Sequence, residues 1–126
     1  MSIITGRVVR GDGYGKVLGF PTANVDRRQF VRLRPKPKLG IYAGYAFVGE
    51  KRYGAAIVIG PKDNKGIPKV EAHLLNFNRN LYGERIAIEL VAYIRPFQPY
   101  TTERALISQI KKDIVKVKSI IKQKNT

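Results

Sequence analysis

The sequence predicts an all-β fold, a small antiparallel barrel with one helix packed on it. Three observations carry this prediction. Up to residue 94, short runs of β-branched and aromatic residues are separated by turns rich in glycine, proline and polar residues. From residue 102 onward, apolar residues recur at helical spacing instead. Neither an internal repeat nor a linker is evident, and 126 residues fit one domain spanning 1–126, with the barrel over about 1–97.

Alternation and turn residues place the strands. The first run ends at a glycine-rich turn, and Gly49-Glu50-Lys51 is typical of a hairpin turn between two later runs. A polar loop follows at 60–69. The last run is the clearest, because its branched residues fall on one face. The expected strands are, in order, residues 3–9, 41–48, 52–59, 70–77 and 85–94.

Two segments depart from the strand pattern. Residues 26–39 follow neither the period of two typical of a strand nor the period of 3.6 typical of a helix, and they contain two prolines. We therefore expect a long loop or flap, a kind of segment that is often functional or mobile in small domains. Residues 102–122 predict an amphipathic helix, with Thr101 or Thr102 as its cap and Glu103 suited to its N-terminal dipole. Its apolar stripe consists of Leu106, Ile110, Ile114, Val117 and Ile121.

The composition excludes several kinds of protein. There is no cysteine, so disulfides, iron–sulfur clusters and thiol nucleophiles are ruled out. His73 is the single histidine, which argues against multi-histidine metal sites and a Ser-His-Asp triad. No apolar run approaches the ~20 residues of a membrane span, and the N-terminus lacks the apolar core of a signal peptide. We therefore expect a cytoplasmic protein without a membrane partner.

The charge calls for an anionic partner. The chain has 24 Lys and Arg against 9 Asp and Glu, a formal net charge of +15. Such basicity suggests nucleic acid or another polyanion such as a nucleotide. The excess falls in two separate places, the first 38 residues and the last 16. In the second of these, lysines 116, 118 and 122 suit the C-terminal end of a helix without any ligand.

The most informative motif is GDGYGKVLGFPTAN, residues 11–24. Its glycines allow the backbone to approach an anion closely, and Lys16 adds a positive charge. Thr22 and Asn24 offer two oxygen ligands of the hard kind that suits Mg²⁺. The segment is neither a P-loop nor a dinucleotide fingerprint. Glycines alone favour a plainer interpretation, a hairpin followed by a proline turn.

The segment LGFPTAN, at 18–24, resembles the signature of riboflavin kinases of the ATP-dependent bacterial and eukaryotic type, including the kinase module of bifunctional FAD synthetases. The similarity continues through GIYAGYAFVG, KVEAHLLNF, NLYGERIAIELVAYIRP and TERALISQIKKDI, in the family's order. It implies a six-stranded antiparallel barrel of Greek-key type with one C-terminal helix. The adenylyltransferase module of the bifunctional enzymes has no counterpart, so we expect FMN and ADP as the products.

The resemblance also implies roles for individual residues. Glu71 corresponds to the catalytic carboxylate that takes the proton from the ribityl 5′-hydroxyl of riboflavin. Thr22 and Asn24 correspond to the residues that bind Mg²⁺, with Zn²⁺ or Mn²⁺ as alternatives, and the nucleotide phosphates. The other residues implied on the ATP side are Gly11, Lys16, Leu74, Asn76 and Tyr82. Those implied on the flavin side are Arg95, Gln98 and Tyr100.

Each assignment has a structural alternative. A lone carboxylate in a strand, such as Glu71, is otherwise a surface residue, because half of all strand positions face water. His73 shares its strand face and is at least as consistent with a structural hydrogen bond. Arg95 could pair with an acid or touch a ligand, and Phe97 and Tyr100 could belong to the core. With riboflavin and ATP as the expected small-molecule partners, we expect a monomer without obligate nucleic acid. The competing hypothesis is a small basic barrel that binds nucleic acid without catalysis.

Overall fold

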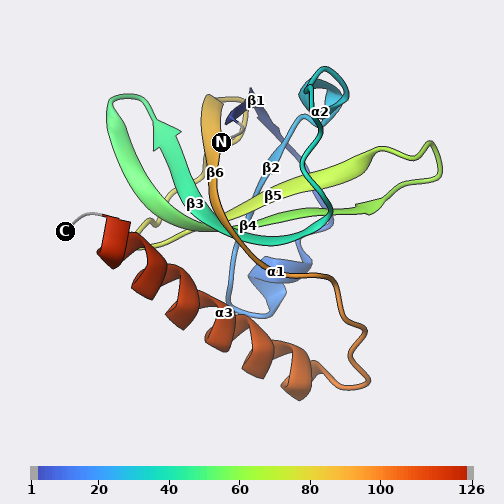
Figure 1. Cartoon of the computed structure of the whole chain (residues 1–126), viewed down its shortest axis with the longest axis vertical. Helices are drawn as coiled ribbons and strands as arrows, with labels where there is room; N and C mark the ends of the chain where they lie inside the picture. Colours follow the sequence, from blue (N-terminus) through green and yellow to red (C-terminus); the bar gives the residue numbers. More distant parts are fainter. Residues whose placement is uncertain (1–2, 125–126) are drawn as a thin grey trace.

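The computed structural model describes residues 3–124. Six antiparallel strands close into one barrel, and the longest helix lies along its outer surface (Figure 1). The order around the barrel is β1-β2-β5-β4-β3-β6. The elements are β1 Ile3–Val9, α1 Tyr14–Val17, β2 Ala23–Val25, α2 Arg28–Val31, β3 Gly40–Val48, β4 Lys51–Lys62, β5 Pro68–Leu74, β6 Arg85–Arg95 and α3 Glu103–Lys124.

The predicted all-β barrel with one C-terminal helix is confirmed. Strands β3, β4 and β5 are consecutive antiparallel neighbours, and β6 returns to lie beside β3. That arrangement is the Greek key. The five strands expected from alternation are all present, and α3 begins and ends within two residues of the expected 102–122. Thr102 is the cap that the helix uses, because its hydroxyl oxygen accepts the backbone N–H of Ala105 at 3.1 Å.

Strand β2 was missed by the alternation pattern. It has three residues, too few to display a period, and it follows a glycine- and proline-rich stretch. Its position is fixed by pairing on both sides: Val25 lies opposite Val8 of β1, and Asn24 lies opposite Glu71 of β5. This short strand therefore completes the barrel.

The segment 26–39 is more ordered than the predicted loop. It contains the helical turn α2, and Phe30 of that turn is 4% exposed within the barrel core. The polar loop expected at 60–69 is also shorter, because β4 extends to Lys62 and β5 begins at Pro68. The pattern failed here because these residues are polar or proline, although their backbones remain paired.

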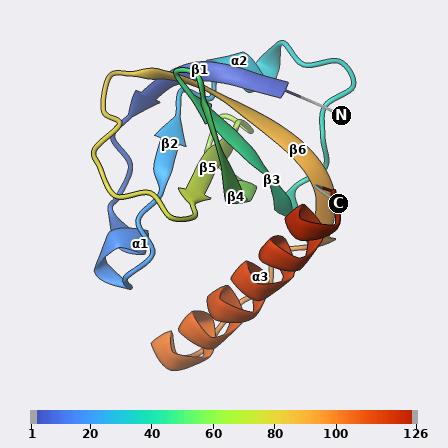
Figure 2. The same ribbon diagram turned by 90° about the vertical axis from the view of Figure 1, so that its left-hand side faces the viewer.

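The molecule has two apolar layers that share β3. Inside the barrel, alternate residues of every strand pack together, with Tyr42 of β3 among them. On its other face β3 packs against α3, so eight of its nine residues are buried. Val117 of α3 is fully buried on this side. Figure 2 shows α3 along the outside of the barrel, with its first turns and α1 both projecting below the strands. Among the described residues, none of the helices has the length and apolar character needed to cross a bilayer.

Candidate active site

The outer face of β5 carries the polar residues of the site. Val70, Ala72 and Leu74 point into the barrel, so Glu71 and His73 point outward. Glu71 lies opposite Asn24 of β2 on one side and Val58 of β4 on the other. Directly paired residues share a face of the sheet. Alternation therefore places Glu71 beside Asn24 on the outside of the barrel.

Glu71 lines a cavity of about 320 Å³ between the barrel and α3. The floor is the outer face of β4 and β5, and the far wall is the inner face of α3. The region of α1 and the loop that follows β6 form the two ends. Ligand cavities in proteins start at about 300 Å³, so this one can take part of a small molecule. The lining residues are Asp12, Tyr14, Gly15, Leu18, Phe20, Thr22, Ile41, Ala56, Val58, Lys69, Glu71, His73, Arg95, Phe97, Gln98, Tyr100, Leu106, Ile110, Asp113 and Ile114.

Gly11 and Asn24 hold the loop after β1 against β2. A Cβ at Gly11 would lie 2.3–2.5 Å from the amide group of Asn24. Only glycine leaves room for that amide, so the loop backbone can lie directly against β2. Lys16 is exposed on α1 and does not line the cavity, whereas its neighbour Gly15 does.

The cavity perturbs the carboxyl group of Glu71. Burial raises its pKa above the usual value, because an ionised carboxylate loses hydration there. The positive charge of Lys69 opposes this rise, and the negative charge of Asp12 adds to it. Within residues 3–124, no hydrogen bond fixes the Glu71 carboxylate. It is therefore a partly desolvated acid that is free to bond a ligand, which is typical of a functional carboxyl group.

Asp12 and Lys69 form an ion pair across the mouth of the site. Lys69 Nζ lies 3.3 Å from Asp12 Oδ2, and Asp12 Oδ1 accepts the backbone N–H of Tyr14 at 2.9 Å. These bonds lower the pKa of Asp12, with the Tyr14 N–H as the main cause. Both side chains are largely solvated, so the pair contributes little stability. Its effect is to place two charges of opposite sign near Glu71.

Arg95 and Asp113 join the end of β6 to α3. The guanidinium donates two bonds to the carboxylate, Nε to Oδ1 at 3.0 Å and Nη2 to Oδ2 at 2.7 Å. Gln109 donates a further bond to Asp113 at 2.9 Å. The side chains of the pair are 16% and 8% exposed, so this is a buried bidentate ion pair. Of the two alternatives for Arg95, pairing with an acid is present, and Arg95 also lines the cavity.

His73 has a structural contact at the other end of the cavity. Its Nδ1 lies 2.7 Å from the carbonyl oxygen of Pro21, and since a carbonyl only accepts, Nδ1 carries the proton. The edge of its ring also meets Phe20, with the ring centroids 5.9 Å apart. These contacts fasten the segment before Thr22 to β5.

The structure gathers some of the predicted site residues and separates others. Around the cavity it brings together Thr22, Glu71, Arg95, Gln98 and Tyr100. The Tyr100 hydroxyl donates to Gln98 Oε1 at 3.1 Å, so these two form one unit. Gly11 and Asn24 lie at the edge of the same region.

Three residues expected on the ATP side lie elsewhere. Leu74 is 6% exposed inside the barrel, so its side chain does not line the cavity; alternation along β5 sends it to the opposite face from Glu71. Asn76 has a left-handed backbone, with φ 54°, and borders a separate groove of about 430 Å³ near the end of α3. Tyr82 is exposed, and the Arg10 guanidinium lies 4.8 Å from its ring centroid.

Sequence reasoning missed several lining residues. Lys69 could have been found from the period of two along β5, which places it on the Glu71 face. Asp12 lies within the glycine-rich motif but was not singled out. The helix residues Leu106, Ile110 and Ile114 were assigned to packing alone, although they also form the cavity wall. Nothing in a helical stripe distinguishes a residue that packs on a strand from one that faces a ligand.

The donor atoms near Glu71 fit a hard divalent cation. The Thr22 hydroxyl, the Asn24 amide and the carboxylates of Asp12 and Glu71 are all oxygen ligands, which suits Mg²⁺ or Mn²⁺. Zn²⁺ favours histidine or cysteine, and His73 commits Nδ1 to Pro21. No group of three His, Cys, Asp or Glu residues capable of holding a metal occurs in the described part of the chain. The site therefore fits a cation that is held partly by ligand oxygens and water.

A family model matches nearly the whole chain. The model described as "Flavokinase: Riboflavin kinase" covers residues 2–121. The chain belongs to the riboflavin kinase family. The residues implied by the LGFPTAN resemblance thus lie within a family match that extends from β1 into α3.

Curated relatives agree with that membership. The chain is 35% identical over 112 residues to a bifunctional riboflavin kinase/FMN adenylyltransferase of Listeria monocytogenes, covering 86% of this chain and 34% of that protein. It is 38% identical over 117 residues to the RNA-binding riboflavin kinase RibR of Bacillus subtilis, covering 90% and 49%. It is 36% identical over 118 residues to the riboflavin kinase of Mus musculus, covering 90% and 76%. The chain thus spans between a third and half of the two bacterial relatives.

Solved structures share the fold. The riboflavin kinase of Trypanosoma brucei superposes with a TM-score of 0.69 at 27% identity, covering 95% of this chain and 79% of that one. A chain described as a macrolide-efflux protein from Streptococcus pneumoniae gives a TM-score of 0.79 at 25% identity, covering 92% of this chain and 38% of that one.

Proposed function

We propose that the protein transfers the γ-phosphoryl group of ATP to the 5′-hydroxyl of riboflavin, giving FMN and ADP. The observation that carries this proposal is the position of Glu71, a carboxylate with a raised pKa and no hydrogen bond within the described chain, facing a cavity beside Thr22 and Asn24. Phosphoryl transfer needs positioned groups, neutralised charge and one base more than it needs covalent chemistry. Family membership supports riboflavin and ATP as the two substrates.

The flavin is best accommodated on the α3 side of Glu71. Leu106, Ile110 and Ile114 form an apolar wall there, and Phe97 and Tyr100 stand at its end. Flat aromatic ligands pack well against such surfaces. In this pose the ribityl chain extends toward Glu71, and the isoalloxazine ring lies between α3 and the outer face of β4.

The nucleotide is best accommodated on the α1 side. Gly11 and Gly15 let the loop around α1 lie directly against Asn24 and the backbone of Phe20, and Lys16 adds a positive charge nearby. We propose that the backbone of this loop contacts the phosphates. Thr22 and Asn24 would hold Mg²⁺, which neutralises phosphate charge when bound. Because Leu74 faces the barrel interior, we propose that its side chain does not contact ATP. We keep the proposal that Asn76 and Tyr82 contact ATP, although neither side chain lines the cavity.

Glu71 acts as the general base in this reaction. The ribityl hydroxyl oxygen forms a bond to the γ-phosphorus while the bond from that phosphorus to the β-bridging oxygen breaks. The hydroxyl proton passes to Glu71, and ADP leaves with the bond electrons. A raised pKa suits this role, because a base is most effective when its pKa approaches the working pH. The partly dry cavity also limits access of competing water.

FMN formation from riboflavin and Mg·ATP, followed by chromatography, tests the proposal. We expect turnover by the parent chain and a fall of roughly 10²–10⁴-fold in kcat for Glu71→Gln, the range that a positioned base typically supplies. Glu84→Gln is the matched control, because Glu84 pairs with Arg79 outside the cavity. Absence of FMN with the parent would reject the function. Equal rates for the parent and Glu71→Gln would reject the role of Glu71 alone.

The competing hypothesis, a barrel that binds nucleic acid without catalysis, has less support. The B. subtilis relative described as RNA-binding is also described as a riboflavin kinase, so the two properties are compatible in one protein. The position of Glu71, Thr22 and Asn24 around one region favours an enzyme.

A further inference from the structure

The outer face of α3 carries a dense set of cations with no acidic counterpart. Along this 22-residue helix, about 33 Å long, the acidic residues are Glu103 at its first position and the buried Asp113. All of its basic residues are exposed. Within residues 3–124, no carboxylate forms an ion pair with any of them. These basic residues are Arg104, Lys111, Lys112, Lys116, Lys118, Lys122 and Lys124, of which Lys118 and Lys122 border the groove near the end of α3.

The helix dipole accounts for few of these charges. Only Lys122 and Lys124 lie in the last turn, where the dipole favours a cation, and the effect fades within one turn. Lys116 and Lys118, which the sequence suggested were suited to the helix end, therefore lie too far from it. Lys112 and Lys116 are four residues apart, so they repel each other and weaken the helix by about 0.2–0.5 kcal/mol.

Most cations of the segment 26–39 behave differently. Arg28 pairs with Asp26, and Arg27 with Asp63. Arg34 donates to the carbonyl oxygens of Val31 and Leu33 at 2.9 and 2.7 Å. These side chains satisfy groups of their own fold, whereas the α3 cations remain available to a partner.

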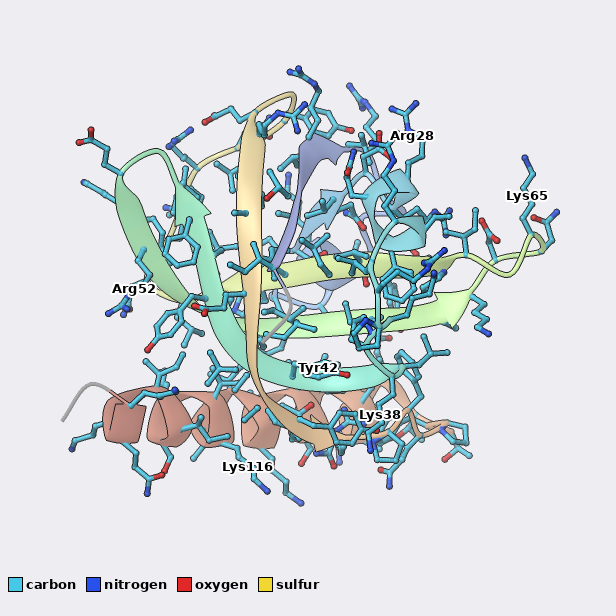
Figure 3. All side chains as sticks on the ribbon, turned by 45° about the horizontal axis from the view of Figure 1, so that its top comes forward. Arg28, Lys38, Tyr42, Arg52, Lys65 and Lys116 are labelled. Carbon is cyan, nitrogen blue, oxygen red and sulfur yellow. The ribbon has the colours of Figure 1, made fainter. Side chains whose placement is uncertain are left out.

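We propose that the outer face of α3 binds nucleic acid through its phosphate backbone, independently of base sequence. Charge complementarity identifies the partner, because a row of cations matches a regular row of phosphates. An anionic membrane fits less well. Membrane-surface helices insert an apolar face, and the apolar face of α3 is turned toward the barrel, where it packs on β3 and β4 and lines the cavity. Val115, at 68% exposed, is the exception on the outer face. Figure 3 shows Lys116 directed away from the barrel.

The surface is separate from the proposed catalytic site. Lys111, Lys112 and Lys116 line neither the cavity containing Glu71 nor the groove near the end of α3. The inner and outer faces of one helix can therefore be tested independently, and failure of either proposal leaves the other standing.

A matched pair of triple variants tests this surface in the full chain. Lys111→Gln/Lys112→Gln/Lys116→Gln removes three charges from α3. Arg32→Gln/Lys62→Gln/Lys65→Gln removes three exposed charges from α2's end and the β4–β5 hairpin, which lie away from α3 (Figure 3). The probes are a labelled 12-nucleotide oligo(U), oligo(dT) of the same length, a 12-base-pair DNA duplex, and vesicles containing phosphatidylserine. Binding is measured by fluorescence anisotropy or co-sedimentation between 50 and 200 mM salt.

We expect binding of at least one nucleic-acid probe by the parent, with affinity falling steeply as salt rises. For a single strand, each lost phosphate contact reduces the salt slope by about 0.7 and the affinity by roughly fivefold at 0.1 M. If all three lysines contact phosphates, the α3 triple variant loses on the order of 100-fold, while its FMN formation stays within about twofold of the parent. The Arg32/Lys62/Lys65 triple variant retains the parent affinity.

Several results would overturn the proposal. These are no binding of any nucleic acid at 0.1 M salt, binding of vesicles alone, and a loss in the Arg32/Lys62/Lys65 variant equal to or larger than that in the α3 variant. Circular dichroism of both variants distinguishes lost binding from lost fold. Glu71→Gln, which targets the kinase reaction, should bind nucleic acid as the parent does.

Discussion

The two faces of α3 differ in how tightly the fold determines them. The inner face packs on β3 and β4, buries Asp113 against Arg95, and forms one wall of the cavity that contains Glu71. The outer face has no packing partner within the described chain, and its cations form no ion pairs there. Residues on the inner face are constrained by their packing on the barrel or by the cavity that they line, whereas those on the outer face are constrained only by solubility and by what binds them. A single helix can therefore serve a catalytic site and a separate surface.

The largest expected effect belongs to the inner face. Replacing Asp113 with Ala leaves the buried Arg95 guanidinium without its carboxylate, and breaking a buried pair in this way costs about 3–5 kcal/mol. We expect a corresponding loss in the free energy of unfolding, measured by urea denaturation. Lys112→Ala, one residue away on the exposed side, is the control and should change it by less than about 0.5 kcal/mol. Similar losses for both variants would mean that the two faces do not differ.

The inner face should also respond to pH. Since burial raises the pKa of Glu71, its charged form is disfavoured in the folded protein. The contribution of Glu71 to stability is therefore largest at low pH and declines as pH rises from the unfolded-state pKa through the higher folded-state pKa. We expect Glu71→Gln to raise the melting temperature at neutral pH, with the gain disappearing below about pH 4. A lower melting temperature at neutral pH would contradict the burial argument.

The pH dependence of the activity should also respond to the charge of Asp12. The negative charge of Asp12 helps to raise the pKa of Glu71, and Asp12 also pairs with Lys69, whose charge lowers it. In Asp12→Asn both influences favour ionised Glu71, so the acid limb of the profile of kcat/KM against pH should move to lower pH. The Lys111/Lys112/Lys116 variant, altered only on the outer face, should leave the limb in place. If the acid limb does not move in Asp12→Asn, Asp12 does not influence the ionisation of Glu71 during the reaction.

The smallest effect is expected on the outer face itself. Removing the charge of Lys112 as Lys112→Gln relieves its repulsion with Lys116, which should stabilise the protein by about 0.2–0.5 kcal/mol at low salt. The gain should shrink at 1 M salt, where charges are screened within about 3 Å. Paired urea denaturation curves at the two salt concentrations would reveal it, and a destabilised variant would indicate an unrecognised contact.

The predictable parts of this molecule are those with a repeating pattern. The long strands and α3 follow from periods of two and of 3.6 that extend over seven residues or more. By contrast β2 is three residues long and α2 is one turn, so each is held by neighbours and not by its own pattern. Phe30 illustrates the difficulty, because an isolated aromatic residue in a basic loop gives no sign that it enters the core.

The candidate site divides in a similar way. The family resemblance located Glu71, Thr22 and Asn24, and the structure brings them to one region of the barrel. The partnership of Arg95 with Asp113 depends on how α3 crosses the end of β6, which is a tertiary relationship. The inward direction of Leu74 was available from alternation along β5, but the resemblance alone does not report side-chain direction.

Because β2 is short, its pairing with both neighbouring strands is the weakest part of the barrel wall. This strand pairs through only two residues with β1 and two with β5, compared with nine between β3 and β4. Short ladders open most readily, so the backbone amides around Asn24 should exchange with deuterated water before those of β3. A ligand that contacts Thr22 and Glu71 together would bridge the start of β2 and β5, and would oppose the separation of these two strands. Ligand binding at the site would then stabilise the wall of the barrel. The binding should be detectable as slower hydrogen exchange of the backbone amides around Asn24.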